Sequence, residues 1–241
     1  MKTSPLPEIP VTDLARFCIL DADKIWRSLL SYRTGHPPYS YQPFRNRVQD
    51  ILNISPEMFQ YCSPSKWTEI QKIIAKKGKL EEQRANLEVA KGLYRFARSK
   101  GVYGRSIFKP AVSVGMGKSA RFWENAVISL DDSPCIPFFD PRKQMGLTKS
   151  ARRFFFSMMH ENIRRADPDF SGVRFAIVRF AANADDDGCR HAKVHYDDGV
   201  DFYSLESMER MISEVYEMWA EIWDARQAER FAPTGSTGTL I

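Results

Sequence analysis

Apolar residues recur at helical intervals through the first third of the chain. From residue 13 to residue 32 they fall at roughly every third or fourth position, which predicts one amphipathic helix. The paired prolines of the next segment, RTGHPPYSYQP, cannot continue a helix and predict a break. Two shorter helices are predicted after the break, over residues 44–52 and 64–77. With a proline-rich arm over residues 1–12, these segments form a predicted N-terminal helical region over residues 1–79.

From residue 80 onward, helical patterns alternate with the short apolar runs that are typical of strands. This order predicts an α/β fold in which a mixed β-sheet is flanked by helices. The expected elements are a helix over 80–101 that ends at Gly101, strands over 111–114, 122–130 and 135–139, a helix to residue 165 capped by Thr148 or Ser150, strands over 173–181 and 192–198, and a helix over 205–227. We therefore predict an α/β core over residues 80–227 and a flexible tail over residues 228–241.

The final helix has two chemically different sides. Its outer side is acidic and is a candidate surface for a protein partner. Its other side carries a continuous apolar stripe, which we expect to lie in the core because such stripes generally serve packing. The stripe comprises Leu205, Met208, Ile212, Val215, Trp219 and Ile222.

Positive charge is concentrated in the middle of the chain. Residues 66–165 contain 21 Lys and Arg against 9 Asp and Glu, whereas residues 166–241 contain 7 against 15. A basic segment favours a polyanionic partner, because neutralising phosphates releases counterions from the polyanion. The alternative is that the acidic end folds against the basic middle and the two charges cancel.

Hydropathy and cysteine spacing limit the class of protein. No apolar run reaches the roughly 20 residues that a membrane helix needs, and the N-terminus lacks the apolar core of a signal peptide. We therefore expect a cytoplasmic protein without a membrane partner. Cys18, Cys62, Cys135 and Cys189 lie far apart with no CxxC pair, which argues against a zinc ribbon and predicts reduced, mostly packed thiols.

Two short motifs suggest chemistry that their context does not support. VGMGKSARF, residues 114–122, ends like a phosphate-binding loop, but Val112 occupies the position of the required first glycine. We expect a glycine-rich turn between strands there, and nucleotide hydrolysis is the least favoured function. His191 and His195 are four residues apart on a predicted strand, which separates them by roughly 13 Å. One metal ion cannot bind both.

The segment DDSPCIPFFDPRK, residues 131–143, places acidic residues at both ends of a predicted hairpin. A tight turn would place Asp131 opposite Ile136 and roughly 13 Å from Asp140, which is too far for two ligands of one metal ion. Metal binding at the hairpin therefore needs a different register, such as one that uses Glu124 as the second carboxylate.

The order of helix, strands, acidic hairpin, helix and strand over residues 80–200 resembles the core of the PD-(D/E)xK nuclease superfamily, which has the restriction-endonuclease-like fold. In this resemblance Asp140-Pro141-Arg142 stands in the (D/E)-x-K position, with arginine in place of the lysine. The other carboxylates of the family motif have two candidates each, Asp132 or Asp131 for the first aspartate and Glu81 or Glu82 for the helix glutamate.

The resemblance implies a nuclease that depends on a divalent metal ion, Mg²⁺. In such enzymes the metal and a neighbouring cation activate water and stabilise the charge that develops on the phosphate. The predicted metal ligands are Asp140, Asp132 and Glu82 from the resemblance and Glu124 from the alternative register, and the predicted catalytic residues are Asp140, Arg142 and Lys143.

Basic residues on the helix over 80–101 supply the predicted nucleic-acid surface, because they fall on the side opposite its apolar residues. With one residue of the glycine-rich turn added, the set is Arg84, Lys91, Arg95, Arg98 and Lys118. The predicted function is a protein that associates with DNA or RNA, as an active nuclease or as a relative without catalysis. The alternative is a non-enzymatic subunit that docks on another macromolecule through the acidic C-terminal helix or the basic middle.

Overall fold

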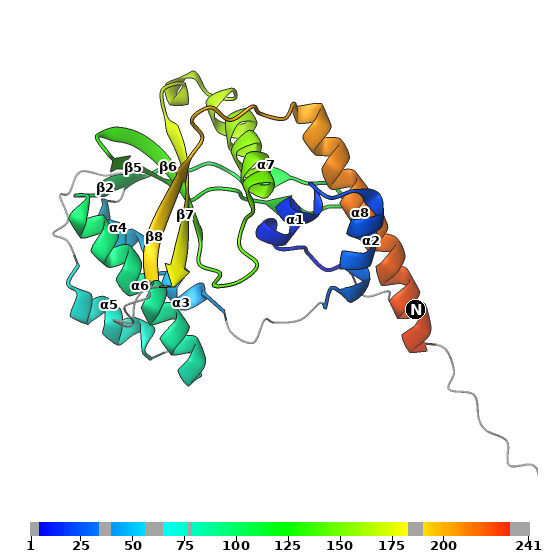
Figure 1. Cartoon of the computed structure of the whole chain (residues 1–241), viewed down its shortest axis with the longest axis horizontal. Coiled ribbons are helices and arrows are strands. Elements are labelled where there is room, and N and C mark those ends of the chain that lie inside the picture. The colour runs from blue at the N-terminus through cyan, green and yellow to red at the C-terminus, as the bar shows by residue number, and fades with distance from the viewer. Residues whose placement is uncertain (1–4, 34–39, 56–64, 77–78, 183–189, 232–241) are drawn as a thin grey trace, which may run out of the picture.

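One six-stranded mixed β-sheet organises the computed structural model (Figure 1). The structure describes residues 5–33, 40–55, 65–76, 79–182 and 190–231. In sheet order the strands are β1 (Ile54–Ser55), β2 (Tyr103–Ser106), β5 (Ala126–Leu130), β6 (Ser133–Asp140), β7 (Arg174–Ala182) and β8 (Arg190–Tyr196). The pairs β1–β2 and β6–β7 are parallel and the other neighbours are antiparallel. A separate hairpin pairs β3 (Val112–Ser113) with β4 (Ser119–Ala120).

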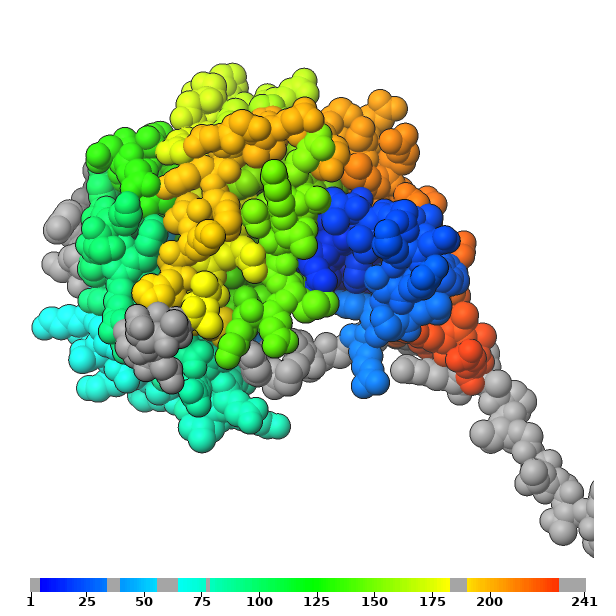
Figure 2. All heavy atoms as spheres, viewed as in Figure 1, coloured from blue at the N-terminus to red at the C-terminus, as the bar shows by residue number. Residues whose placement is uncertain are grey.

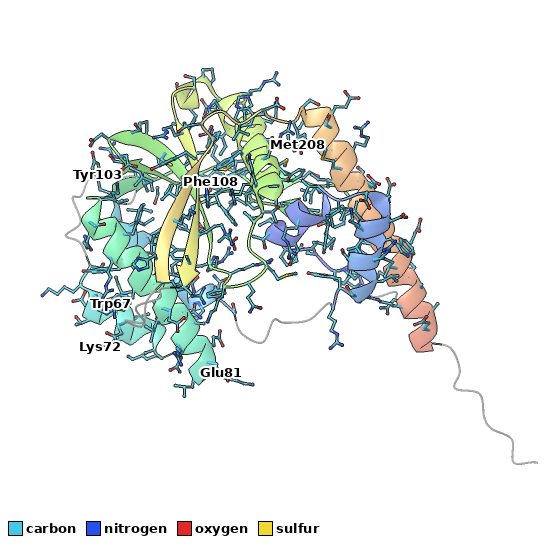
Figure 3. All side chains as sticks on the ribbon, viewed as in Figure 1. Trp67, Lys72, Glu81, Tyr103, Phe108 and Met208 are labelled. Atoms are coloured by element: carbon cyan, nitrogen blue, oxygen red, sulfur yellow. The ribbon has the colours of Figure 1, made fainter. Side chains whose placement is uncertain are left out.

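Helices lie on both sides of this sheet, so the predicted α/β architecture is confirmed (Figure 1). One side carries α3 (Gln42–Arg45), α4 (Val48–Leu52), α5 (Trp67–Ile74) and α6 (Leu80–Ser99). The other side carries α1 (Val11–Phe17), α2 (Ala22–Ser31), α7 (Lys149–Met159), the turns η1 (His160–Arg164) and η2 (Pro168–Phe170), and α8 (Leu205–Phe231). Figure 3 shows Trp67 and Lys72 of α5 far from Met208 of α8.

Side chains that alternate along β6 and β7 divide between two apolar cores. Phe138 and Ile177 point to the α7 side, where the ring centroids of Phe138 and Phe155 lie 4.5 Å apart. Phe139 and Val178, one residue further along each strand, are buried on the α6 side. Because both faces are covered, these strands read as nearly continuous apolar runs in the sequence.

The last helix packs against the first ones, α8 lying beside α1 and α2 (Figure 2). Arg226 of α8 donates hydrogen bonds to the carbonyl oxygens of Leu29, Leu30 and Tyr32, at 3.1, 2.9 and 3.0 Å. These carbonyls belong to the C-terminal end of α2, where a helix has no intrahelical donors of its own. The two ends of the chain therefore complete one another.

The structure corrects several predicted boundaries. The single helix expected over residues 13–32 is two helices, because Asp21 caps α2 by accepting a hydrogen bond from Lys24 N at 3.0 Å. α8 continues to Phe231 rather than ending at residue 227. The sequence pattern does not predict β1, β2 or β4, since strands of two to four residues are too short to show a period.

Two predictions about helix ends are confirmed, and the predicted stripe of α8 is buried at five of its six positions. Gly101 follows α6 with a left-handed φ of 60°, and Thr148 caps α7 by accepting from Ala151 N at 3.2 Å. Leu205 is 44% exposed and does not join the predicted stripe of α8. The other members of that stripe are buried, namely Met208, Ile212, Val215, Trp219 and Ile222.

The β5–β6 hairpin turns through Asp131 and Asp132, whose φ angles of 50° and 58° are left-handed. Leu130 pairs with Ser133, so these two residues make up the whole turn. The predicted register, with Asp131 opposite Ile136, is therefore wrong.

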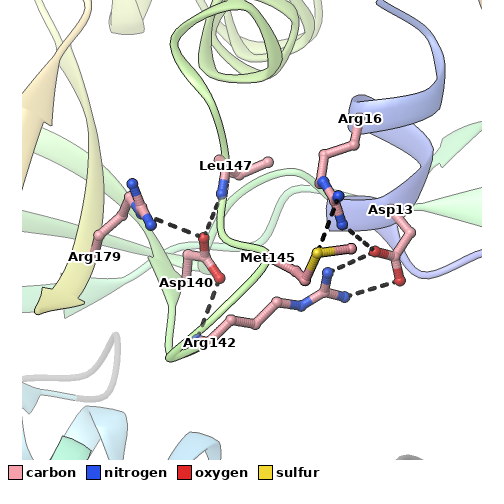
Figure 4. A network of polar contacts seen from close by, with 7 residues as sticks. All are labelled: Asp13, Arg16, Asp140, Arg142, Met145, Leu147 and Arg179. Carbon is pink, nitrogen blue, oxygen red and sulfur yellow. Dashed lines mark hydrogen bonds and ion pairs between the residues drawn. The ribbon is translucent and has the colours of Figure 1, made fainter. Parts of the chain in front are cut away.

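Asp140 is fully buried at the end of β6, where it pairs with Arg179 of the parallel strand β7 (Figure 4). Its carboxylate accepts hydrogen bonds from Leu147 N at 2.9 Å and from Arg142 N at 3.4 Å, and Arg179 Nε lies 3.8 Å away. A buried carboxylate is tolerated when donors and a cation surround it in this way. The connection from β6 to α7 is thus wrapped around one charged group.

A second ionic contact ties this connection to the N-terminal helices. Arg142 forms a bidentate ion pair with Asp13 of α1, with N–O distances of 2.6 and 3.0 Å (Figure 4). Arg16 lies 3.4 Å from the same carboxylate. Because bidentate pairs fix orientation as well as distance, α1 is positioned against the β6–α7 connection.

We predict that Gly92→Ala lowers the free energy of unfolding by about 1–3 kcal/mol, in spite of the better helix propensity of alanine. A Cβ at Gly92 would collide with the carbonyl oxygen of Arg190 and lie 2.9 Å from its carbonyl carbon, where α6 crosses β8. Urea unfolding measures the change. Gly172→Ala is the matched control, since its Cβ would meet nothing within 4 Å. Equal stability of the two variants would contradict the close crossing.

A second prediction concerns the buried carboxylate. Asp140→Asn keeps the shape of the side chain but leaves Arg179 without its anion, so we expect the free energy of unfolding to fall by about 2–3 kcal/mol. Asp132→Asn in the exposed hairpin turn is the control, with an expected change below about 0.5 kcal/mol. Thermal and urea unfolding compare them, and an unchanged Asp140→Asn would show that the carboxylate is not needed for the fold.

Candidate protein-binding surface

The carboxylates predicted to bind Mg²⁺ lie in separate environments. Within the described ranges, no group of three or more His, Cys, Asp or Glu is placed to hold a metal ion. Glu82 accepts a hydrogen bond from Ser40 N at 3.3 Å, and Asp140 serves the β6–α7 connection. Asp132 is exposed in the hairpin turn, while burial raises the pKa of Glu124. Magnesium binding by these residues stays a prediction.

Asp131, the other candidate for the first aspartate, joins a surface network. It accepts a hydrogen bond from Tyr196 Oη at 2.6 Å and forms an ion pair with Lys100 at 2.9 Å. The Tyr196 hydrogen bond, followed by that of Lys100, lowers the pKa of the Asp131 carboxyl. These contacts join the turn after β5 to β8 and to the end of α6, and they explain the position of Asp131.

The predicted catalytic cations differ in their contacts. Arg142 forms an ion pair with Asp13, whereas Lys143, the next residue in the chain, is exposed. Arg142 therefore holds α1 in place, a role that the spacing of the motif does not indicate.

The predicted nucleic-acid residues do not form one continuous surface. Lys118 lies in the turn of the β3–β4 hairpin, which packs into the α7-side core, whereas the other four residues lie on α6. Arg84 forms an ion pair with Glu88 at 3.1 Å. Arg98 lies 4.8 Å above the ring of Tyr94 and donates to Ser65 O at 3.1 Å. The two remaining members are Lys91 and Arg95, half-buried and exposed, respectively.

The structure also bears on the predicted glycine-rich turn, the cysteines and the absence of a membrane helix. The segment expected as a glycine-rich turn is the turn between β3 and β4, with left-handed φ angles at Gly115, Met116 and Gly117. Cys18 and Cys135 are buried free thiols, while Cys62 and Cys189 lie outside the described residues. None of the helices in the described part of the chain is long and apolar enough to cross a membrane.

A groove of about 610 Å³ lies between α5 and α6, at the end of the molecule where Figure 3 labels Trp67 and Glu81. Leu80, at the start of α6, is 81% exposed there. Trp67 is half-buried against Tyr94, with ring centroids 5.6 Å apart. The lining residues are Trp67, Gln71, Leu80, Gln83, Arg84, Leu87, Glu88 and Lys91.

The lining of the groove combines apolar side chains with side chains of both charges. Trp67, Leu80 and Leu87 supply apolar lining, whereas Arg84 and Glu88, which also line the groove, form an ion pair. Apolar centres with polar rims, in which Trp and Arg are enriched, are typical of protein–protein interfaces. Sequence analysis missed this site, although Leu80, Leu87 and Lys91 follow one another at helical intervals of seven and four on the side of α6 that was read as basic.

The comparisons with known proteins concern nearly the whole chain. Residues 12–229 match the family model described as "Sliding clamp-binding bacterial toxin SocB". The chain is 31% identical over 233 residues to the DNA replication inhibitor toxin SocB of Caulobacter vibrioides (strain NA1000 / CB15N), a match that covers 96% of each protein. No solved structure matches the chain.

These matches overturn the resemblance to the PD-(D/E)xK superfamily and the functions drawn from it. The prediction of a nuclease is wrong, as is that of nucleic acid as the main partner, because the family is described by a protein partner. The alternative, a non-enzymatic protein that docks on another macromolecule, fits the matches better. On this evidence the chain belongs to the family of sliding clamp-binding bacterial toxins named SocB.

Proposed function

We propose that this protein binds the bacterial sliding clamp and thereby inhibits DNA replication. The observation that carries the proposal is the family match, which spans residues 12–229 and thus both sides of the sheet. The 31% identity to a replication inhibitor supports the same activity. Inhibition by occupying the clamp needs no catalytic group, and it takes place in the cytoplasm, where the clamp works.

The α5–α6 groove is the surface that best suits a protein partner. Leu80 exposes most of its side chain, and Trp67 and Leu87 continue the apolar surface into the groove. Covering such side chains removes apolar area from water, which is the main favourable term in protein association. The neighbouring pair of Arg84 and Glu88 can exchange hydrogen bonds with a partner. We assign this groove to the clamp contact.

We predict that the double variant Leu80→Ala and Leu87→Ala weakens binding to the purified clamp by about tenfold or more, since truncating central apolar anchors removes most of their binding energy. Biolayer interferometry or calorimetry measures the affinity. Phe108→Ala is the matched control, because Phe108 is 75% exposed but lies outside the groove.

The outcomes separate the site from the function. If unmodified protein fails to bind the clamp, the function itself is wrong. If the groove variant binds normally while Glu217→Lys in the acidic face of α8 weakens binding, the clamp contact lies on α8 instead. Leu87 is half-buried against the α6-side core, so urea unfolding of the groove variant checks that its fold is retained.

We also predict that induced expression of the protein stops incorporation of labelled thymidine in bacterial cells, while chromosomal DNA stays uncut. The groove variant is expected to restore incorporation in proportion to its loss of clamp affinity. Arrest by the groove variant at equal protein level would contradict the link between this surface and inhibition.

A further inference from the structure

Cationic side chains gather on one face of the edge strand β8. In the antiparallel register of β7 and β8, Arg179 lies opposite Lys193, and Ile177 lies opposite His195 two residues further along. Residues two apart on a strand share a face, so Arg179, Lys193 and His195 lie on the same side as Ile177. Ile177 belongs to the core under α7, which places the three side chains on the side opposite to α6 and its groove.

The first turn of α7 adds positive charge to this face. Lys149 and Arg152 lie in this turn and Arg153 follows them, and the turn holds no acidic residue although the N-terminal end of a helix is itself positive. Arg153 is paired with Asp201, whereas Arg152 donates to the carbonyl of Leu147 at 3.0 Å. Arg152 is close enough to Arg179 for the latter to lower its pKa, an effect second to that of burial.

Negative charge does not match these cations. In the described ranges the acid that faces them is Asp140, and Arg179 Nε lies 3.8 Å from its carboxylate. Within the described part of the chain this Nε is buried without a hydrogen-bond acceptor, and neither Arg152 nor Lys193 has an ion pair. Among the residues that the structure describes, three cations therefore face one carboxylate, which leaves an excess of two positive charges at neutral pH.

His195 responds to this excess. Its pKa is lowered from the ordinary 6.5 to about 4, first by burial and then by the positive charges of Arg152, Lys193 and Arg179. No acidic group acts on the imidazole in the opposite direction among the residues described. At neutral pH the ring is therefore uncharged and can donate a hydrogen bond from one nitrogen.

We propose that Arg152, Arg179, Lys193 and His195 form a binding site for the dianionic phosphate group of a phosphate monoester. Two negative charges balance the excess, whereas a carboxylate or a phosphodiester brings one. Guanidinium and ammonium groups supply the charge-assisted donors that phosphate oxygens require. Figure 2 shows β8 in yellow at the front surface, beside the green segment that leads into α7.

The site is partly open, as a small anion requires. Lys193 is exposed, and the side chain of Arg179 is 34% exposed in spite of its buried Nε. Gly146 of the β6–α7 connection packs so closely on the Arg179 guanidinium that a Cβ there would lie 3.0 Å from its Cζ. The guanidinium is thus held in place before any ligand arrives, which lowers the entropy lost on binding.

The test uses the ring of His195 as a reporter in the full-length protein, followed by NMR. Inorganic phosphate at neutral pH is expected to shift the ring signals saturably, whereas chloride at the same ionic strength does not. Inorganic sulfate, which keeps both charges in acid, is expected to raise the pKa of His195 by about one pH unit. A nucleoside monophosphate in place of phosphate distinguishes a nucleotide ligand from the free ion, and saturable binding of either supports the site.

Lys193→Gln is the test variant, because Lys193 is exposed on an edge strand and its loss leaves no buried charge unpaired. We expect its affinity for phosphate to fall about tenfold, while clamp binding through the opposite face is unchanged. Lys72→Gln on α5 is the matched control and keeps full affinity. An equal response to chloride, equal losses in the two variants, or tighter binding of an acidic peptide or duplex DNA than of phosphate would each overturn the proposal.

Discussion

Burial of one carboxylate at the end of β6 determines the arrangement of the α7 side of the molecule. A charged group that leaves water must find donors within the protein, and those around Asp140 are backbone N–H groups of the β6–α7 connection and the guanidinium of Arg179. The connection is therefore held around the carboxylate, which fixes where α7 begins. Arg142, in the same connection, then orients α1 through Asp13.

This constraint gives the two sides of the sheet different surface chemistry. On the α7 side, one buried negative charge is surrounded by cations from β7, β8 and α7, so positive charge is in excess among the residues described there. On the α6 side, charges pair locally, since Glu88 lies near both Arg84 and Arg190, and apolar side chains gather in the groove. An apolar groove suits a protein surface, whereas clustered cations suit a small anion.

Local patterns in the sequence predicted the helices and strands well where the periodic pattern extends over many residues. The stripe of α8, the end of α6 at Gly101 and the cap at Thr148 follow from neighbouring residues alone. The partners of Asp140 could not be predicted, because Arg179 is brought beside it by parallel pairing with a strand 39 positions away. The order of helices and strands also misled the functional prediction, since unrelated functions share such α/β arrangements. The groove could not be predicted either, because it depends on how α5 is placed against α6, and periodicity within one helix does not predict that placement.

The hydrogen bonds from Arg226 to the end of α2 join residues 194 to 197 positions apart, so their formation depends on the order of synthesis. A ribosome releases α2 long before α8, and until α8 emerges the final carbonyls of α2 lack these donors. Contacts at such long range also form late in folding. A nascent chain therefore lacks its complete α7-side core until α8 has been synthesised, and any activity that needs this core begins only after that point.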